Sequence, residues 1–476
     1  MLQLRPEVAE PSQAAREKAR RELERALGPS KVLTEPLACE RFLHDESEAE
    51  GRVPDAVVLA ESTDDILAAL QVARETDVPI TPRAGGTGRT GGAVPVAGGI
   101  VLSTLGMSSI KEIDRKECVA VVGPGVVLGE LHRAVEREGL FYPPDANSLA
   151  SCALGGNVAE NAGGPRAFKY GVTREYVLGL EALLIGGQRL QVGRRTVKGV
   201  TGYDVTALLV GSEGTLAVFG DITLRLVPLP PTVMTLMALF TDVRGAARAV
   251  TEIIGAGLVP RCLEFLDGST LQAIRAAGNP IDARAGAMLL IEVDGDAPAC
   301  EAQAERIAGV CQDVRALELL VAQDTAQRDR LWAARREMSS AVRRLTRYKL
   351  SEDVVVPRQA IPELLSRVER LSEQHRIRTL TYGHAGDGNL HVNFLWDDPA
   401  ELPAVEASIE QLFRSVVELR GTLTGEHGVG VLKAPYLPLE QSAELISLQR
   451  DLKRVFDPRG LLNPGKIFPS VGHRAC

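Results

Sequence analysis

Two short motifs in the C-terminal half carry residues that could bind a metal ion and move a proton. The first, TYGHAGDGNLHVNF, places His384 and His391 on either side of a glycine-rich turn, and the second, GTLTGEHGVG, places Glu426 beside His427. A strand entering such a turn and another leaving it can bring two imidazoles together. Two imidazoles and a carboxylate suit a borderline divalent cation and leave positions open for a substrate. The alternative is a β-hairpin with buried structural histidines.

These residue types could help to remove a proton from a hydroxyl group. A divalent cation bound to the hydroxyl lowers its pKa, and a neutral histidine can accept the proton. An oxidation that also removes a hydride from the adjoining carbon requires a redox cofactor. The residues alone leave open which histidine binds the metal and which acts as the base. A zincin protease is excluded, because the sequence has no HEXXH motif.

An anionic substrate also needs a cation. The segment RDRLWAARREMSSAVRRLTRYK, residues 328–349, is rich in arginine and predicts a helix. Arginine matches a carboxylate through two parallel hydrogen bonds. Most arginines of such a helix are expected on a solvated face.

Three glycine-rich segments precede these motifs, at 81–93 (TPRAGGTGRTGGA), 143–164 and 198–224. Glycines allow consecutive backbone N–H groups to point into one concavity, which binds a diphosphate. The first segment is neither a Walker A motif nor a GxGxxG turn that opens a helix. We therefore expect several loops to converge on one long ligand, and a flexible surface loop is the alternative for the first segment.

The patterns predict an α+β protein of several parts. A charged amphipathic helix is expected within 1–50, and glycine-rich loops between short strands at 51–229. The proline-rich VPLPPT marks a boundary, after which alternating strand and helix patterns at 230–430 predict an antiparallel sheet covered by helices. The segment 431–476 contains a helix that ends at Asp457-Pro458 and is expected to return to the first part.

The order RAGGTG, GGNVAENAGG, GYD and GSEGTLAV resembles the FAD domain of the vanillyl-alcohol-oxidase (PCMH-type) superfamily. Within it, the chain is most similar to glycolate oxidase flavoprotein subunits, cytochrome-type D-lactate dehydrogenases and D-2-hydroxyglutarate dehydrogenases, from about Val53 to Phe468. The resemblance implies a PCMH-type FAD-binding domain of two subdomains, a substrate domain, and FAD-dependent oxidation of a small (D-)2-hydroxy acid to its 2-oxo acid.

The resemblance also implies which residues contact FAD. The pyrophosphate would be wrapped by the first loop (Arg83, Ala84, Gly85, Gly86, Thr87, Gly88), and the adenosine would contact the third segment (Gly214, Thr215, Val218). The flavin side would be lined by Pro144, Asp145 and Ser148, and the isoalloxazine and ribityl chain by Gly155, Gly156, Asn157 and Asn161. Near the C-terminus, Asn463 would also contact the flavin. Thr87 stands where covalent members carry a histidine, and Ala217 where many relatives have glycine. Cys152 is expected to be a buried structural thiol. We therefore expect non-covalent FAD.

In the second half, the resemblance assigns His384, His391 and Glu426 to a divalent metal (zinc, manganese or iron) and His427 to the base. Asn393 would contact substrate or flavin. The stretch WAARREMSS resembles the segment that supplies substrate-carboxylate contacts, which favours Arg335, with Lys349 as a second choice.

The composition of the chain limits the kinds of molecule that it is expected to bind. The net charge of −8 and the pI near 5.6 argue against nucleic acid. The seven cysteines form no CxxC pair, which disfavours an iron–sulfur cluster within the chain and suits the cytoplasm. The sequence contains no run of ~20 apolar residues, so no membrane-spanning helix is predicted. Peripheral attachment to the inner face of the membrane would need a partner.

Two other functions stay open. One is a flavin-bearing electron-transfer subunit of a multi-subunit glycolate oxidase, paired with an iron–sulfur chain. The other is a non-redox relative that makes ether lipids. The electron acceptor would be a quinone, a cytochrome or an iron–sulfur subunit, and a homodimer is the alternative assembly.

Overall fold

The computed structural model describes residues 10–469, apart from the side chains at 333, 334, 336, 337, 339–341 and 343. The chain divides into two compact units. The first comprises the described residues up to Gly163, then Val172–Leu229 and those from Glu426 onward, and the second comprises Gly164–Gly171 and Pro230–Gly425.

The first unit begins with a small sheet covered by helices. Its strand order is β1-β2-β4-β3, and β2 and β3 run parallel to β4. A capping box of Ser62 and Asp65 starts the long helix of this layer. The elements are α1 (Gln13–Leu27), β1 (Val32–Leu33), α2 (Pro36–Glu40), β2 (Ala56–Leu59), α3 (Thr63–Thr76), β3 (Ile80–Arg83) and β4 (Ile100–Ser103).

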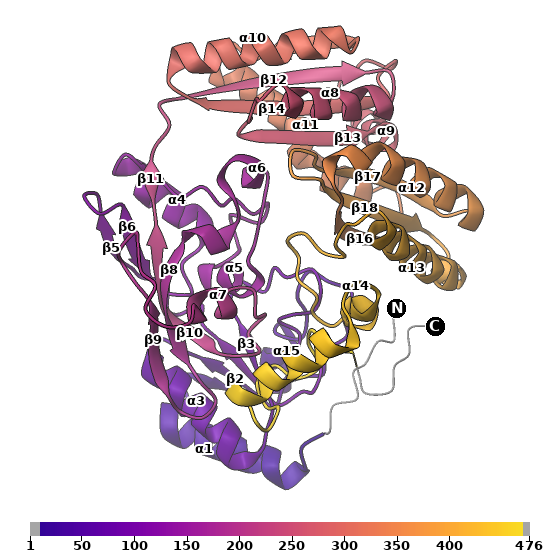
Figure 1. Cartoon of the computed structure of the whole chain (residues 1–476). Coiled ribbons are helices and arrows are strands. Elements are labelled where there is room, and N and C mark those ends of the chain that lie inside the picture. The colour runs from indigo at the N-terminus through magenta and orange to yellow at the C-terminus, as the bar shows by residue number, and fades with distance from the viewer. Residues whose placement is uncertain (1–9, 470–476) are drawn as a thin grey trace. The chain divides into compact units, whose positions relative to one another are not determined.

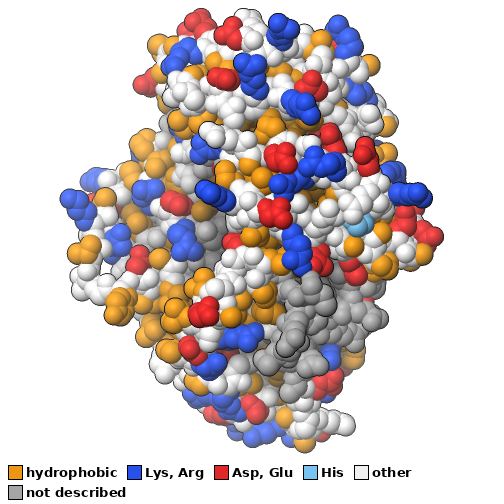
Figure 2. Space-filling view, turned by 45° about the vertical axis from the view of Figure 1, so that its right-hand side comes forward, with side chains coloured by type: hydrophobic (Ala, Val, Ile, Leu, Met, Phe, Trp, Pro, Cys, Tyr) orange, Lys and Arg blue, Asp and Glu red, His pale blue; other side chains and the backbone are white. Residues whose placement is uncertain are grey.

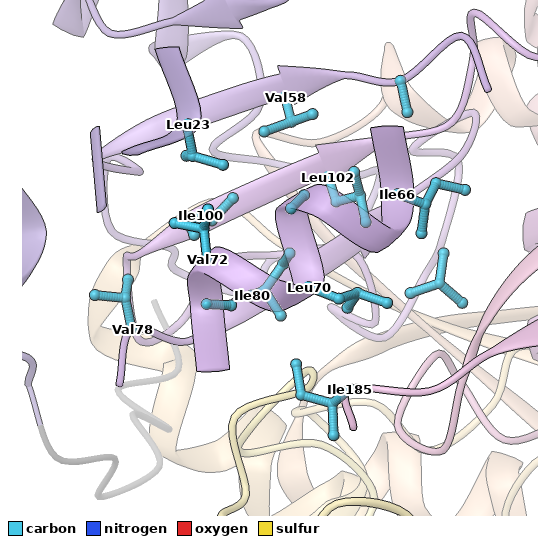
Figure 3. Close-up of a cluster of buried hydrophobic side chains, with 14 of the residues drawn as sticks. Leu23, Val58, Ile66, Leu70, Val72, Val78, Ile80, Ile100, Leu102 and Ile185 are labelled. Carbon is cyan, nitrogen blue, oxygen red and sulfur yellow. The ribbon is translucent and has the colours of Figure 1, made fainter. Parts of the chain in front are cut away.

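The core of this layer lies between α3 and the sheet. Figure 3 shows Ile66 and Leu70 of α3 beside Ile80 and Ile100 of the strands, and all four side chains are fully buried. Burial of such side chains is the main favourable contribution to folding. The core therefore fixes the end of β3, where the first glycine-rich loop begins.

The second layer of the first unit is a five-stranded antiparallel sheet of order β5-β6-β10-β8-β9, with a two-stranded pair β11-β7. Its helices and the C-terminal helix α15 complete the unit (Figure 1). The elements are β5 (Ile110–Asp114), β6 (Val119–Val122), α4 (Leu128–Arg137), β7 (Leu140–Phe141), α5 (Leu154–Glu160), η1 (Thr173–Tyr176), β8 (Val177–Leu183), β9 (Arg189–Gly193), α7 (Val205–Leu209), β10 (Val218–Arg225), β11 (Val227–Pro228), η4 (Ala434–Tyr436), α14 (Leu437–Glu440) and α15 (Ala443–Phe456).

The second unit is a seven-stranded antiparallel sheet of order β15-β12-β14-β13-β17-β18-β16. Helices α8, α10, α12 and α13 pack on it and on one another, and α9 and α11 share a separate apolar cluster with the sheet (Figure 1). The elements are α6 (Ala167–Tyr170), β12 (Thr232–Phe240), α8 (Val243–Gly255), β13 (Cys262–Asp267), α9 (Gly268–Ala276), β14 (Ala287–Gly295), α10 (Ala297–Asp313), β15 (Glu318–Val321), α11 (Thr325–Arg343), β16 (Tyr348–Val355), η2 (Arg358–Ala360), α12 (Ile361–His375), β17 (Arg378–His384), β18 (Asn389–Trp396), η3 (Pro399–Glu401) and α13 (Leu402–Glu418).

The α+β class and the antiparallel sheet are confirmed, and one element expectation is wrong. The helix predicted over 328–349 ends at Arg343, and Lys349 lies on β16. The reason is pairing that the local pattern does not reveal, because β16 forms eight register pairs with β18.

The surface carries both charges. Figure 2 shows basic and acidic side chains interspersed over the face in view, with apolar side chains between them. Within residues 10–469, no helix has the length and apolar character that crossing a bilayer requires.

Candidate functional site

The first unit brings the glycine-rich loops together. A Cβ at Gly85 would lie 2.6 Å from the carbonyl oxygen of Ser151, and one at Gly156 would lie 3.5 Å from the Cβ of Ala84. The loop after β3 therefore packs backbone to backbone on the segment that leads into α5, and only glycine at 85 permits this approach. The first two segments thus lie side by side, and their convergence on one ligand stays a prediction.

Unused polar groups surround these loops. Among the described residues, the backbone N–H groups of Ala84–Gly88 donate no hydrogen bond to another protein group. One guanidinium nitrogen of Arg83 (Nη1) and the Oδ1 of Asn463 are also buried without a hydrogen-bond partner in the described part of the chain. Buried polar atoms are usually satisfied. A loop of donors beside an arginine fits a diphosphate, so the residues present fit FAD.

The other residues expected at FAD lie in the same unit. Gly155, Gly156 and Asn157 lie on α5, and Asn161 follows it in a left-handed conformation, with its Oδ1 accepting a hydrogen bond from the backbone N–H of Arg174 at 2.9 Å. The remaining positions are in the loop after β7 (Pro144, Asp145, Ser148), the turn before β10 (Gly214, Thr215) and the start of β10 (Val218), where the side chain is part of the hydrophobic core.

Cys152 is a buried thiol, as expected. Its side chain is 2% exposed, and burial raises the pKa of this thiol. A protonated thiol is a poor nucleophile, which disfavours a thioether to flavin at this position.

Glu213, which no sequence argument had singled out, anchors the segment that follows His427. Its two carboxylate oxygens accept hydrogen bonds from the backbone N–H groups of Val429 and Gly430, each at 2.7 Å. The hydroxyl of Thr90 donates to the carbonyl oxygen of His427 at 3.0 Å. The Nδ2 of Asn463 donates to the carbonyl oxygen of Glu213 at 2.8 Å. These bonds hold the GEHG motif against the glycine-rich loops.

Glu426 and His427 belong to this first unit. The Nε2 of His427 is 3.9 Å from the Oε1 of Glu426, and their side chains are 19% and 12% exposed. A Cβ at Gly163 would lie 2.9 Å from the Oε2 of Glu426. Glycine at the end of the second glycine-rich segment thus makes room for the carboxylate.

In the second unit, the expected histidine hairpin is confirmed. Strands β17 and β18 pair around the turn and place the rings of His384 and His391 perpendicular to each other, with centroids 5.4 Å apart. Both side chains are buried, at 2% and 4% exposure.

The buried carboxylate of Glu264, on β13, lies beside this hairpin. Its Oε1 is 2.5 Å from the Nδ1 of His384, and its Oε2 accepts a hydrogen bond from the Nε of Arg335 at 2.7 Å. Burial alone would raise the pKa of Glu264, but the charges and hydrogen bonds of these two partners outweigh it and lower the pKa. No local sequence pattern marks Glu264 as a site residue.

All three expected substrate residues contact Tyr382. The guanidinium carbon of Arg335 lies 5.4 Å from the ring centroid, the Nζ of Lys349 is 3.4 Å from the phenol oxygen, and the hydroxyl of Tyr382 donates to the Oδ1 of Asn393 at 3.3 Å. The Nη2 of Arg335 is buried without a hydrogen-bond partner in the described part of the chain.

A second buried carboxylate, Asp353 on β16, holds the chain after α13. Its Oδ2 accepts hydrogen bonds from the backbone N–H of Gly425 at 2.8 Å and from the hydroxyl of Thr424 at 3.0 Å. The Nδ1 of His391 is 3.9 Å from its Oδ1. Asp353 thus positions Thr424 and Gly425, the first residue of the GEHG motif.

Comparisons with known proteins agree with this arrangement. The family FAD linked oxidases, C-terminal domain, matches residues 229–467, and the family FAD binding domain matches residues 54–193. The glycolate oxidase subunit GlcD of Bacillus subtilis (strain 168) is 42% identical over 432 residues, which cover 90% of this chain and 92% of that protein. A D-lactate dehydrogenase of Anaerostipes hadrus is 33% identical over 457 residues, which cover 93% and 95%.

A solved structure shares the fold. That of p-cresol methylhydroxylase with substrate bound superposes with a TM-score of 0.81 at 16% identity, over 98% of this chain and 100% of that chain. The chain therefore belongs to the FAD-linked oxidase family, as an oxidoreductase with a PCMH-type FAD-binding fold.

Proposed function

We propose that this enzyme oxidises a small 2-hydroxy acid, in its D form, to the 2-oxo acid, with non-covalent FAD and a divalent metal. The observation that carries the proposal is the group of Arg335, Lys349 and Asn393 around Tyr382, in the same unit as the buried pair His384 and His391. Two cations beside neutral hydrogen-bonding groups suit a carboxylate with an adjacent hydroxyl. The names of the two relatives, which refer to glycolate and D-lactate, support the substrate class.

The donor set fits a divalent cation. Glu264 accepts the proton of the Nδ1 of His384, so the lone pair of that ring is on Nε2, an atom that commonly binds metals. We propose His384, His391 and Glu426 as ligands, with zinc, manganese or iron as the ion. Two imidazoles and one carboxylate leave coordination positions for the substrate.

The chain's own groups then have distinct tasks. Arg335 and Lys349 bind the substrate carboxylate, which orients the hydroxyl, and Asn393 adds a hydrogen bond. His427 accepts the hydroxyl proton as the carbonyl forms. When bound, the metal supplies a Lewis acid and FAD supplies the acceptor for the hydride on Cα.

Flavin reduction by substrate tests the proposal directly. We expect anaerobic bleaching of the flavin by at least one of glycolate, D-lactate and D-2-hydroxyglutarate, slower bleaching by L-lactate, and loss of bleaching after treatment with a chelator. Stopped-flow absorbance at the flavin band measures each rate. If none of these acids reduced the flavin, the proposed function would be wrong.

The flavin is expected to dissociate from denatured protein. Thr87 offers no imidazole for attachment, and the buried thiol of Cys152 has a raised pKa. Acid precipitation should therefore leave a colourless pellet and a yellow supernatant. Colour that stayed with the pellet would contradict non-covalent binding.

The name of the Bacillus relative favours a second possibility, that the enzyme works as one subunit of a larger assembly. Its electrons would then pass to a partner chain with iron–sulfur clusters, a cytochrome or a quinone. Reduction of an artificial dye by the purified chain with substrate distinguishes the two, because an obligate subunit would give no turnover alone.

A further inference from the structure

Glu264 is a buried acid between two apolar residues of its strand. It lies on β13 in the sequence CLEFLD, and the flanking residues Leu263 and Phe265 are buried on the same strand. Its own side chain is fully buried. A buried carboxylate is costly unless charged or hydrogen-bonding partners compensate for the lost hydration. The groups that hydrogen-bond to Glu264 should therefore explain why an acid occupies this position.

The two oxygens of Glu264 serve two different groups. Strand register places Glu264 directly opposite His384 of β17, and Oε1 contacts the Nδ1 of that ring. Oε2 accepts from the Nε of Arg335, which reaches the sheet from α11. One carboxylate thus joins a proposed metal ligand to a proposed substrate-binding arginine.

We propose that Glu264 is a positioning residue that couples the metal ligand to the carboxylate-binding arginine. Its Oε1 fixes the tautomer and the ring orientation of His384, and its Oε2 fixes the direction of the guanidinium of Arg335. Carboxylates that hydrogen-bond the second nitrogen of a metal-bound imidazole tune affinity in this way. The inference rests on the proposed function, and it adds a residue that acts through two others.

Glutamine at 264 should uncouple the pair. An amide of the same shape has one acceptor oxygen and one NH₂ group that only donates. The oxygen can accept a hydrogen bond from either the Nδ1 of His384 or the Nε of Arg335, and the NH₂ group then faces the other N–H. We expect Glu264→Gln to weaken metal binding about 10–100-fold. We also expect the KM for the 2-hydroxy acid to rise about tenfold, as for the loss of one charge-assisted contact. FAD content should not change.

Glu292 provides the matched control. It is a buried acid on the neighbouring strand β14, and it too accepts a hydrogen bond from α11, from the Nε1 of Trp332 at 2.6 Å. It also accepts hydrogen bonds from the hydroxyl of Thr235 and the thiol of Cys262, and its Oε2 lies 3.6 Å from the Nε of Arg261. Glu292→Gln should therefore change stability without changing metal affinity or KM. A purely structural role for Glu264 predicts the same result for both variants.

The measurement is Zn²⁺ affinity of the FAD-loaded full chain, by competition with a chromogenic chelator, together with KM and kcat for the best acid. Metal affinity and KM equal to those of the wild type in Glu264→Gln would overturn the inference. If Glu264→Gln does not fold, Glu264→Asp replaces it. The shorter acid cannot reach both partners, so either the metal affinity must fall or the KM must rise. Failure of the proposed function looks different, because the wild-type chain itself would bind no metal and its flavin would not be bleached.

Discussion

Replacement of His427 by alanine should lower the rate of flavin reduction by ~10²–10⁴-fold, the usual contribution of a general base. The imidazole is proposed to accept the hydroxyl proton, and alanine offers no acceptor. FAD and metal contents should stay near those of the wild type, because neither is assigned to the ring of His427. The segment should also keep its conformation, since Thr90 binds the backbone carbonyl of residue 427 rather than its side chain.

The bonds of Glu213 to the next residues support the same expectation. Val429 and Gly430 are held through their backbone N–H groups, which the substitution does not touch. Stopped-flow reduction across pH measures the effect, and the limb of the pH profile that reports the base should disappear. His375→Ala is the control, because this histidine lies on α12 and its ring contacts Gln411. A rate within a few-fold of the wild type would reject His427 as the base.

Features that depend on neighbouring residues could be predicted from the sequence. The hairpin of His384 and His391 follows from a glycine-rich turn between two apolar runs, and the structure has it. The glycine-rich loops likewise predict close backbone contacts, as Gly85 shows. Turn chemistry and periodicity are local, so one sequence is sufficient to detect them.

Features that depend on strand register could not be predicted from the sequence. Glu264 is separated from His384 by 120 positions, and only the pairing of β13 with β17 places them side by side. The strand CLEFLD gives only a weak signal, an acid between apolar residues with a second acid, Asp267, at the end of the strand. Lys349 lies on a strand rather than on the predicted helix, because that strand is defined by pairing with β18, and its role in substrate binding stays a prediction.

Glu213 shows a third kind of omission. The motif GSEGTL drew attention to its glycines as ligand-binding backbone, whereas the acid between them binds the backbone of Val429 and Gly430. A carboxylate that accepts hydrogen bonds from backbone N–H groups of a distant segment produces no periodic pattern in the sequence. Such a residue can be recognised only when both segments are placed in space.

Substitution of Glu426 by glutamine should abolish stable metal binding. A neutral amide oxygen is a much weaker ligand for a borderline divalent cation than a carboxylate. Loss of groups that merely support ligands already costs 10–100-fold in affinity, so the loss of a charged ligand should cost at least ~100-fold. The space for the side chain is unchanged, because glutamine has the same shape and Gly163 still leaves room for it.

Metal content after dialysis, measured by elemental analysis, checks this expectation. The wild-type chain should retain about one ion, and Glu426→Gln should retain almost none while keeping its FAD. Glu444→Gln, an exposed acid at the start of α15, is the control for a change of net charge. Because the metal is proposed to acidify the substrate hydroxyl, bleaching by the 2-hydroxy acid should be lost together with the ion in Glu426→Gln. Excess Zn²⁺ should not restore bleaching in this variant, whereas it should restore bleaching in wild-type chain stripped of its metal by a chelator. Unchanged metal content in Glu426→Gln would remove this carboxylate from the ligand set and leave the two imidazoles without their acidic partner.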